Sequence, residues 1–338
     1  MKIDIFPHIM PAKYREKLLE VLSPSSQRKY GPVFAIPMLS DLESRFKVMD
    51  LYEGLVQVLT LASPAIEENH DSRVAVDLAK LANDELARLV TKYPDRFVTA
   101  VAALPMNDIE EALTEIDRAI RDLQLKGIQL FTPVNDKALD SPEFLPIYEK
   151  MAQYDLPIWI HPTRNADYPD YRTEKESKYV VYSVFGWPFE TAVAMTRLVF
   201  SGVFDKWPKL KFLTHHCGGM VPFFEQRITS IYKKAATVLG TQFDLKKPLI
   251  EYYRMFYNDT ALYGGTPSLM CGYAMFGADH MLFGTDMPLG DSQGGMENTG
   301  KTIESIERMN ITPEEKKKVF ELNARKLLGL SGNPLSNR

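Results

Sequence analysis

The chain has 338 residues, 45% of them hydrophobic and 25% charged, which is the balance of an ordinary soluble globular protein. Its formal net charge of -4 leaves no basic footprint of the kind that binds nucleic acid or an anionic membrane. With only two cysteines, no disulfide framework is implied, and we expect a cytoplasmic protein. No segment reaches the roughly 20 apolar residues that span a bilayer, and the N-terminus lacks a signal-peptide core.

Short apolar runs bounded by turn residues predict eight buried strands along the chain. They cover residues 2–5, 54–61, 97–104, 126–131, 156–161, 209–214, 255–259 and 280–286. Segments with helical periodicity separate most of them, for example 108–124 and 141–155. Alternating strand and helix signals favour a parallel sheet, and eight such units favour a closed (β/α)₈ TIM barrel. We therefore expect an α/β protein with one barrel domain over residues 1–338.

Two stretches exceed what a simple strand-to-helix connection needs. Residues 6–53 hold five prolines and predict an N-terminal insertion. Residues 162–186 form a polar, tyrosine-rich loop directly after the fifth strand. A long loop at the active edge of a barrel is typically a lid or a specificity element.

Three histidines and one aspartate lie at or just beyond the ends of predicted strands: His8, His161, His216 and Asp286. The carboxyl ends of parallel strands share one edge, where the active sites of barrels are found. Imidazole and carboxylate together suit Zn²⁺, Mn²⁺ or Fe²⁺, and a catalytic site needs three protein ligands and an open position. His8, His161 and Asp286 would supply those three ligands.

Several neighbouring residues have both a functional and an ordinary interpretation. His216 precedes Cys-Gly-Gly, a turn that leaves its ring free to reach a substrate. If strand alternation persists, His215 points the opposite way and is structural. Cys217 is expected to be a small buried thiol and not a nucleophile. Arg45 and Arg227 lie on amphipathic segments, where each is either solvated or a clamp for a substrate carboxylate.

At these residues the chain resembles the amidohydrolase superfamily, in the branch that contains aminocarboxymuconate-semialdehyde decarboxylase. The resemblance runs through MKIDIFPHIMP, DLESRFKVMD, YPDRFVTAVAALPM, KGIQLFTPVN, IWIHP, GWPFETAVA, SGVFDKWPKLKFLTHHCGGMVPFFEQRI and FGTDMPLG. The order and spacing of these segments are together highly specific. The resemblance implies a (β/α)₈ barrel that carries one divalent metal, commonly zinc or manganese.

Carried over position by position, the resemblance implies a role for each candidate residue. It makes His8, His161 and Asp286 the metal ligands and His216 the catalytic histidine. Arg45 and Arg227 match arginines that recognise the substrate carboxylate, and Trp187 matches a residue that lines the substrate pocket. In the family the second arginine reaches across a dimer interface, so the resemblance implies a homodimer.

Phe6 is a serious departure from the family pattern. The family's first strand ends in His-x-His or Glu-x-His, with both outer residues on the metal, and Phe6 stands at the first of these positions. A phenyl ring offers no donor atom, so metal affinity should fall. Another residue or a water would complete the shell, or the barrel would be a metal-poor binding protein.

The leading hypothesis is a metal-dependent, non-oxidative decarboxylase of a small unsaturated or aromatic carboxylic acid, with Zn²⁺ favoured over Mn²⁺. His216 and Asp286 would handle protons, an arginine would hold the carboxylate, and Phe6 and Trp187 would pack against a planar substrate. The alternative is a hydrolase that opens a lactone or an amide on the same scaffold. A non-catalytic binder is a third class, favoured only by Phe6.

Overall fold

The protein is described here by a computed structural model that covers residues 1–68, 71–240 and 243–330. Its strands follow the chain in the order β1 Lys2–Asp4, β2 His8–Ile9, β3 Leu55–Leu61, β4 Phe97–Ala100, β5 Ala102–Ala103, β6 Ile128–Thr132, β7 Ile158–Pro162, β8 Phe212–Thr214, β9 Tyr257–Asp259 and β10 Met281–Leu282. β1 and β2 both pair with β3. β4 and β5 together correspond to the single strand predicted over residues 97–104. The segments thus occupy eight positions around one sheet.

The sheet is parallel and closes on itself. Neighbouring strands pair in parallel from β3 to β4 and from β5 through to β10. The first and last strands meet where the Ile5 amide donates to the Phe283 carbonyl at 2.8 Å. The Asp4 carboxylate accepts from the Thr285 amide at 3.0 Å and from its hydroxyl at 2.6 Å. The predicted (β/α)₈ barrel is confirmed.

Apolar side chains fill the barrel. Trp159 from β7 is fully buried there, and its indole N–H donates to the Ile5 carbonyl at 3.0 Å. Its cluster contains residues from β1, β3, β8 and β10, namely Ile3, Val56, Val58, Leu213 and Leu282. Because the interior is packed, a ligand must bind above the strand ends.

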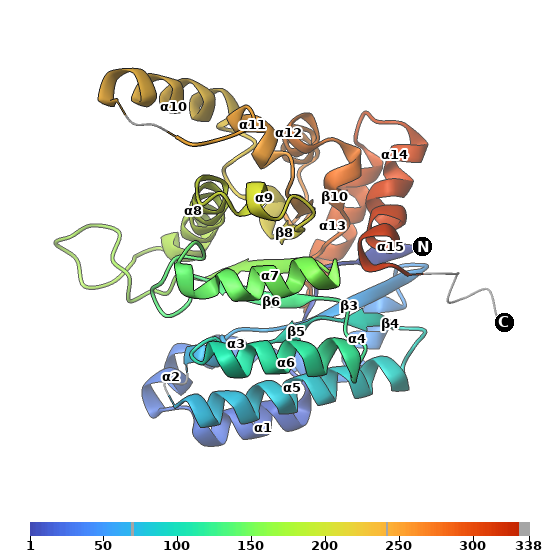
Figure 1. The fold of residues 1–338 in the computed structure, drawn as a ribbon. Coiled ribbons are helices and arrows are strands. Elements are labelled where there is room, and N and C mark those ends of the chain that lie inside the picture. The colour runs from blue at the N-terminus through green and yellow to red at the C-terminus, as the bar shows by residue number, and fades with distance from the viewer. Residues whose placement is uncertain (69–70, 241–242, 331–338) are drawn as a thin grey trace.

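Helices surround the barrel (Figure 1). They are α1 Ala12–Val21, α2 Pro24–Lys29, α3 Gly31–Phe34, α4 Leu42–Met49, α5 Ser72–Lys92, α6 Ile109–Arg121, α7 Leu145–Tyr154, α8 Trp187–Phe200, α9 Val203–Lys206, α10 Glu225–Leu239, α11 Leu249–Tyr253, α12 Thr266–Phe276, α13 Met296–Glu307, α14 Pro313–Lys317 and α15 Asn323–Leu328. In α6, Asp108 caps the N-terminus, and Ala112, Ile116 and Ala119 form a buried stripe at helical spacing. Among the described residues, no helix combines the length and hydropathy needed to cross a bilayer.

The two predicted additions to the barrel are both present. The N-terminal insertion forms β2 and α1 to α4, and α1 packs on α5 through the buried side chains of Tyr14 and Leu18. The loop after β7 projects from the barrel beside α8 (Figure 1) and returns through a short π-helical turn, Tyr182–Gly186. Both additions lie on the edge of the barrel where the cavity described below opens.

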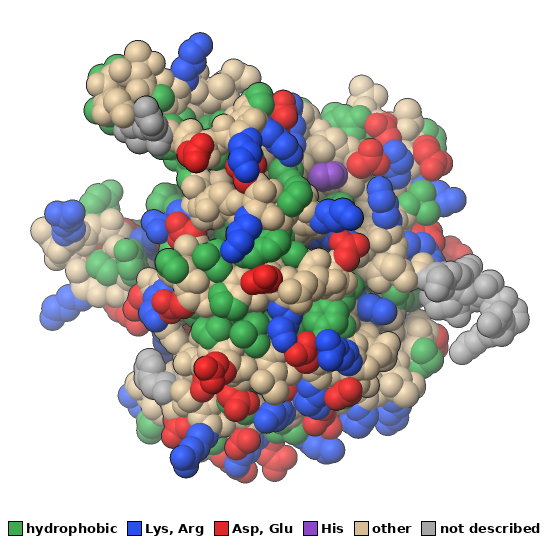
Figure 2. All heavy atoms as spheres, viewed as in Figure 1, with side chains coloured by type: hydrophobic (Ala, Val, Ile, Leu, Met, Phe, Trp, Pro, Cys, Tyr) green, Lys and Arg blue, Asp and Glu red, His purple; other side chains and the backbone are tan. Residues whose placement is uncertain are grey.

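Helix α10 stands away from the rest of the chain (Figure 1). It contains no buried residue, and Ile231, Val238 and Leu239 are exposed on it. On the face shown in Figure 2, acidic and basic side chains are mixed over the lower helices, and the projecting α10 shows some hydrophobic side chains. Exposed apolar side chains on a projecting helix are typical of a surface that contacts another protein.

Glu67 gives a testable pH dependence of stability. It is buried in η2 (Ile66–Glu68), and its Oε1 has no hydrogen-bond partner among the described residues. Burial raises its pKa to about 8. Since the folded state holds this proton more tightly than the unfolded chain, the contribution of Glu67 to stability is fully present below about pH 4 and is lost as the pH rises through 8.

We expect Glu67→Gln to raise the free energy of unfolding by up to about 5 kcal/mol at pH 8.5 and to change it little at pH 4.5. Urea unfolding at the two pH values measures the difference. Glu68→Gln is the matched control, because this neighbour is more exposed and bonds to Tyr30. Equal stabilisation at both pH values would mean that Glu67 is not protonated in the folded protein.

Candidate metal centre

The three predicted metal ligands meet at one edge of the barrel. His8 begins β2, His161 lies in β7 and Asp286 follows β10. The His8 Nε2 atom is 3.0 Å from Asp286 Oδ1, and the rings of His8 and His161 are 4.9 Å apart between centroids. All three residues are buried. The sequence separated them by more than 100 residues each, and the parallel barrel brings them together.

Their chemistry fits a divalent cation. His8 Nε2 and His161 Nδ1 have no hydrogen-bond partner among the described residues, although Asp286 Oδ1 lies close to the first. Burial lowers the pKa of both imidazoles, so each is neutral near pH 7 and keeps a free lone pair. Although burial opposes ionisation of Asp286, its contacts with His215 and His8 hold its pKa well below the usual range. Neutral imidazoles beside a carboxylate form a donor set for zinc or manganese.

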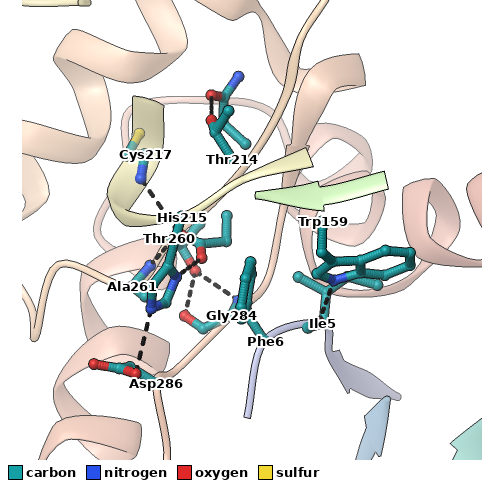
Figure 3. Close-up of polar contacts among 12 residues, drawn as sticks. Ile5, Phe6, Trp159, Thr214, His215, Cys217, Thr260, Ala261, Gly284 and Asp286 are labelled. Carbon is teal, nitrogen blue, oxygen red and sulfur yellow. Dashed lines mark hydrogen bonds and ion pairs between the residues drawn. The ribbon is translucent and has the colours of Figure 1, made fainter. Parts of the chain in front are cut away.

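The prediction that His215 points away from the site is wrong. Its ring is fully buried between two carboxylates, with Nδ1 bonded to Asp259 Oδ2 and Nε2 3.3 Å from Asp286 Oδ1 (Figure 3). Burial acts to lower its pKa, but Asp259 and Asp286 outweigh burial and raise the pKa to about 10. His215 is itself still extended (φ -82°, ψ 160°), so it lies on the same side as Leu213 in the barrel interior. The backbone turns into positive φ only afterwards, +55° at His216 and +53° at Cys217.

His216 lies at the side of the cluster. Its ring is 3.8 Å from that of His215 and stacks at 6.3 Å on Trp187. Burial and the neighbouring His215 lower its pKa to about 3, so it is neutral near pH 7. Its Nδ1 has no partner among the described residues and is free to exchange a proton. Cys217 is buried with a raised pKa, as expected for an inert thiol.

The backbone around these side chains is unusual. Asp286 has a φ of +64°, and its second oxygen accepts the Tyr263 hydroxyl. In the turn after His216, a Cβ on Gly219 would lie 2.3 Å from the Pro188 carbonyl, so a side chain has no room there. Residues with such backbone conformations cluster at sites where geometry serves function.

A cavity of about 770 Å³ opens above the cluster. His8, His161 and Trp187 line it, together with Tyr30 and Val33 from the insertion. Arg164, from the long loop, also lines it and is held by Glu190 at 3.0 Å. This volume suits a small organic molecule.

Arg45 and Phe6 do not line this cavity, which corrects two expectations. Arg45 is fully buried, donating to the His8 carbonyl and, at 3.3 Å, to Gln57 Oε1. It therefore positions the backbone of His8, and we do not propose it as a direct substrate contact. Phe6 lies beneath the histidines, with its ring stacked 4.1 Å from that of His215. Its side chain faces the barrel core.

Arg227 lies in a separate groove of about 490 Å³ between α8 and α10. Within one chain it is not part of the cavity that holds His8 and His161. The aromatic pair before it, Phe223 and Phe224, is 78% and 37% exposed, and Phe224 lines the same groove.

Comparison with known proteins identifies the family. The amidohydrolase family model matches residues 41–330. The gamma-resorcylate decarboxylase of Polaromonas sp. is 32% identical over 314 residues, covering 90% of this chain and 92% of that protein. The 2-amino-3-carboxymuconate-6-semialdehyde decarboxylase of Dictyostelium discoideum is 31% identical over 77% of this chain and 68% of its own length.

A solved structure of the same kind matches the whole barrel. It is a dihydroxybenzoic acid decarboxylase from Polaromonas sp. with bound manganese and the inhibitor 2-nitroresorcinol, with a TM-score of 0.77, 26% identity and 99% of both chains covered. The chain belongs to the amidohydrolase family. Its relatives are carboxy-lyases, and the resemblance to the decarboxylase branch is confirmed.

Proposed function

We propose that this protein is a metal-dependent, non-oxidative decarboxylase of a small aromatic carboxylic acid. The observation that carries the proposal is the buried cluster in which His8 lies 3.0 Å from Asp286 and beside the His161 ring, next to a cavity lined by His8, His161 and Trp187. The relatives act on dihydroxybenzoate-type acids and an aminocarboxymuconate semialdehyde, all of them small carboxylates. Fold alone does not define function, so the proposal rests on the site.

The reaction replaces a carboxylate by a proton. As carbon dioxide leaves, the electron pair of the broken bond stays on the ring carbon, which must then be protonated. When bound, a divalent metal supplies a positive charge that anchors an anionic substrate and offsets charge that develops on it. Neutral His216, whose Nδ1 has no partner among the described residues, and the Asp286 carboxylate are placed to accept a proton from water or the substrate and to pass it to that carbon. Trp187 offers a flat apolar surface to the ring.

Arg164 is the arginine of this chain that supports recognition of the carboxylate. It lies on the cavity wall, stacked 4.1 Å from the centre of the Tyr168 ring and paired with Glu190. A guanidinium held in this way keeps N–H groups available for a planar carboxylate. Arg28, Lys29 and Lys175 also line the cavity and add positive charge.

For the metal we propose one divalent ion per chain. The neutral imidazoles of His8 and His161 and the Asp286 carboxylate suit Zn²⁺, our first expectation, and also Mn²⁺, which the Polaromonas structure contains. Elemental analysis after purification in the absence of chelators identifies it. If the protein takes up neither ion, the result would support the alternative that the barrel is a metal-poor, non-catalytic binding protein.

Product analysis tests the function directly. The metal-loaded protein is incubated with hydroxybenzoates, including 2,6-dihydroxybenzoate, and separately with aromatic lactones and amides. We expect one carbon dioxide released for each phenol formed, without an oxidant. Ring opening of a lactone or release of an amine without carbon dioxide would instead establish the hydrolase.

We further propose that the protein works as a cytoplasmic homodimer. Cys217 and Cys271 are both free, as in a reducing compartment. The exposed apolar face of α10 and the exposed Phe223 call for a partner surface, and a second copy is the simplest one. Arg227 would then enter the partner's cavity, because it lies outside the cavity of its own chain.

Mixing two inactive variants tests this shared site. If Arg227 acts in trans, a dimer of one Arg227→Ala chain and one His216→Ala chain contains one fully intact site. Random subunit exchange should then restore about a quarter of wild-type activity, because half of the dimers are mixed and one site in each works. A mixture of His216→Ala with Asp286→Asn is the control. Each substitution disables the site of the chain that carries it, so a mixed dimer contains no intact site. No recovery in the first mixture, with exchange demonstrated, would contradict the shared site.

A further inference from the structure

The first barrel strand supplies one metal ligand where the family pattern has two. Phe6 has no donor atom, and its ring is stacked on His215 with 4.1 Å between centroids and 25° between planes. His215 therefore lies in contact with the side chain that stands at the missing ligand's place. Its ring also contacts those of His8, His161 and His216.

The ligand atoms around His215 have the spacing of a coordination shell. Those of His8, His161 and His215 all lie within 4.8 Å of one another, as do those of His215, His216 and Asp286, so His215 is common to both groups. Asp286 Oδ1 is 3.0 Å from His8 Nε2 and 3.3 Å from His215 Nε2. Donors that share one ion at about 2.1 Å are roughly 3.0–3.4 Å apart in octahedral or tetrahedral arrangements. Both distances to Asp286 fall in that range.

The other side of the His215 ring is held as in a metal-bound histidine. Its Nδ1 bonds to Asp259 Oδ2, while Asp259 Oδ1 accepts the amides of Cys217 at 3.2 Å and Ala261 at 3.0 Å (Figure 3). A carboxylate in this position fixes the tautomer that leaves Nε2 free and makes that nitrogen a better donor. No such carboxylate contact is found for His216 among the described residues.

We propose that His215 is a metal ligand in this protein and fills the place in the shell that Phe6 cannot. The shell is then His8, His161, His215 and Asp286, with Asp259 as a positioning residue and Phe6 as a packing surface. The inference rests on the metal site of the proposed function. It separates the two adjacent histidines, with His215 on the metal and His216 free to move protons.

Metal affinity tests this division without any measurement of turnover. Wild-type protein, His215→Ala and His216→Ala are loaded with Zn²⁺ and dialysed against a competing chelator, and bound metal is measured. Because a ligand should matter more than its supporting shell, we expect His215→Ala to weaken affinity by more than about 100-fold. Asp259→Asn should weaken it by about 10–100-fold, and His216→Ala should leave it near wild type.

Adding a donor at position 6 provides a rescue. Phe6→His combined with His215→Ala should regain metal binding, whereas Phe6→His combined with His161→Ala should not regain it to the same extent. Co²⁺-substituted protein adds a spectrum, since its visible absorption should change with Asp259→Asn and stay unchanged with His216→Ala. The Co²⁺ spectra of Asp259→Asn and His216→Ala test the inference even if His215→Ala does not fold.

Wild-type affinity in folded His215→Ala, or an unchanged Co²⁺ spectrum in Asp259→Asn, would overturn the inference and make His215 a hydrogen-bonding partner of Asp286. The outcome for the proposed function is separate. A protein that binds metal through His215 yet releases no carbon dioxide from any acid would keep this ligand assignment and remove the decarboxylase.

Discussion

Asp286→Asn is expected to abolish turnover and to deplete the bound metal. The carboxylate contacts His8, His215 and the Tyr263 hydroxyl at once, so its loss removes a ligand and the negative charge of the site. Its part in proton transfer alone should cost about 10²–10⁴-fold in kcat. Carbon dioxide release and elemental analysis on the same preparation measure both effects.

The control for Asp286→Asn is another buried carboxylate. Glu115→Gln removes an acid that is 2% exposed, but Glu115 pairs with Arg118 on α6 and bonds to Asn83, outside the histidine cluster. We expect this variant to lose stability and to keep its metal and its kcat. An Asp286→Asn protein with full metal content and near-normal turnover would place the site elsewhere in the barrel.

His216→Ala is expected to lower kcat by about 10²–10⁴-fold and to leave the metal in place. The structure places this ring beside the cavity wall formed by Trp187, with Nδ1 free of any partner among the described residues. Its lowered pKa, about 3, keeps the ring neutral through the working pH range. The loss should therefore be of similar size from pH 6 to pH 8.

His280→Ala is the matched histidine control. His280 stacks on Tyr257 and contacts the Phe256 carbonyl, outside the cluster. We expect its metal content and kcat to match those of the wild type. If His216→Ala instead lost the metal while His215→Ala kept it, the roles of the two adjacent histidines would be reversed.

The barrel and most of the cluster were predictable from the sequence for a simple physical reason. Buried parallel strands read as short apolar runs, and the residues at their carboxyl ends must share one edge. His8, His161 and Asp286 stand at such ends, so their meeting follows from topology. The insertion over residues 6–53 and the loop over 162–186 were visible as lengths in excess of a simple connection.

The errors arose where the backbone leaves the regular pattern. His215 was expected to face away because the inward position was given to His216, whereas His215 is still extended and lies on the same side as Leu213, and positive φ angles begin only at His216. The Cys-Gly-Gly that follows was the available signal, since glycines commonly allow such a turn. The burial of Arg45 had no signal, because its partners, the His8 carbonyl and Gln57, come from other elements.

Metal reconstitution coupled to product measurement decides whether this barrel is a metal-dependent decarboxylase. Chelator-treated protein receives increasing Zn²⁺ or Mn²⁺, and bound metal and carbon dioxide release from the best hydroxybenzoate are measured on each sample. We expect activity to rise in proportion to bound metal and to saturate at about one ion per chain. Carbon dioxide release that does not depend on metal, or full metal occupancy with no release from any acid, would contradict it.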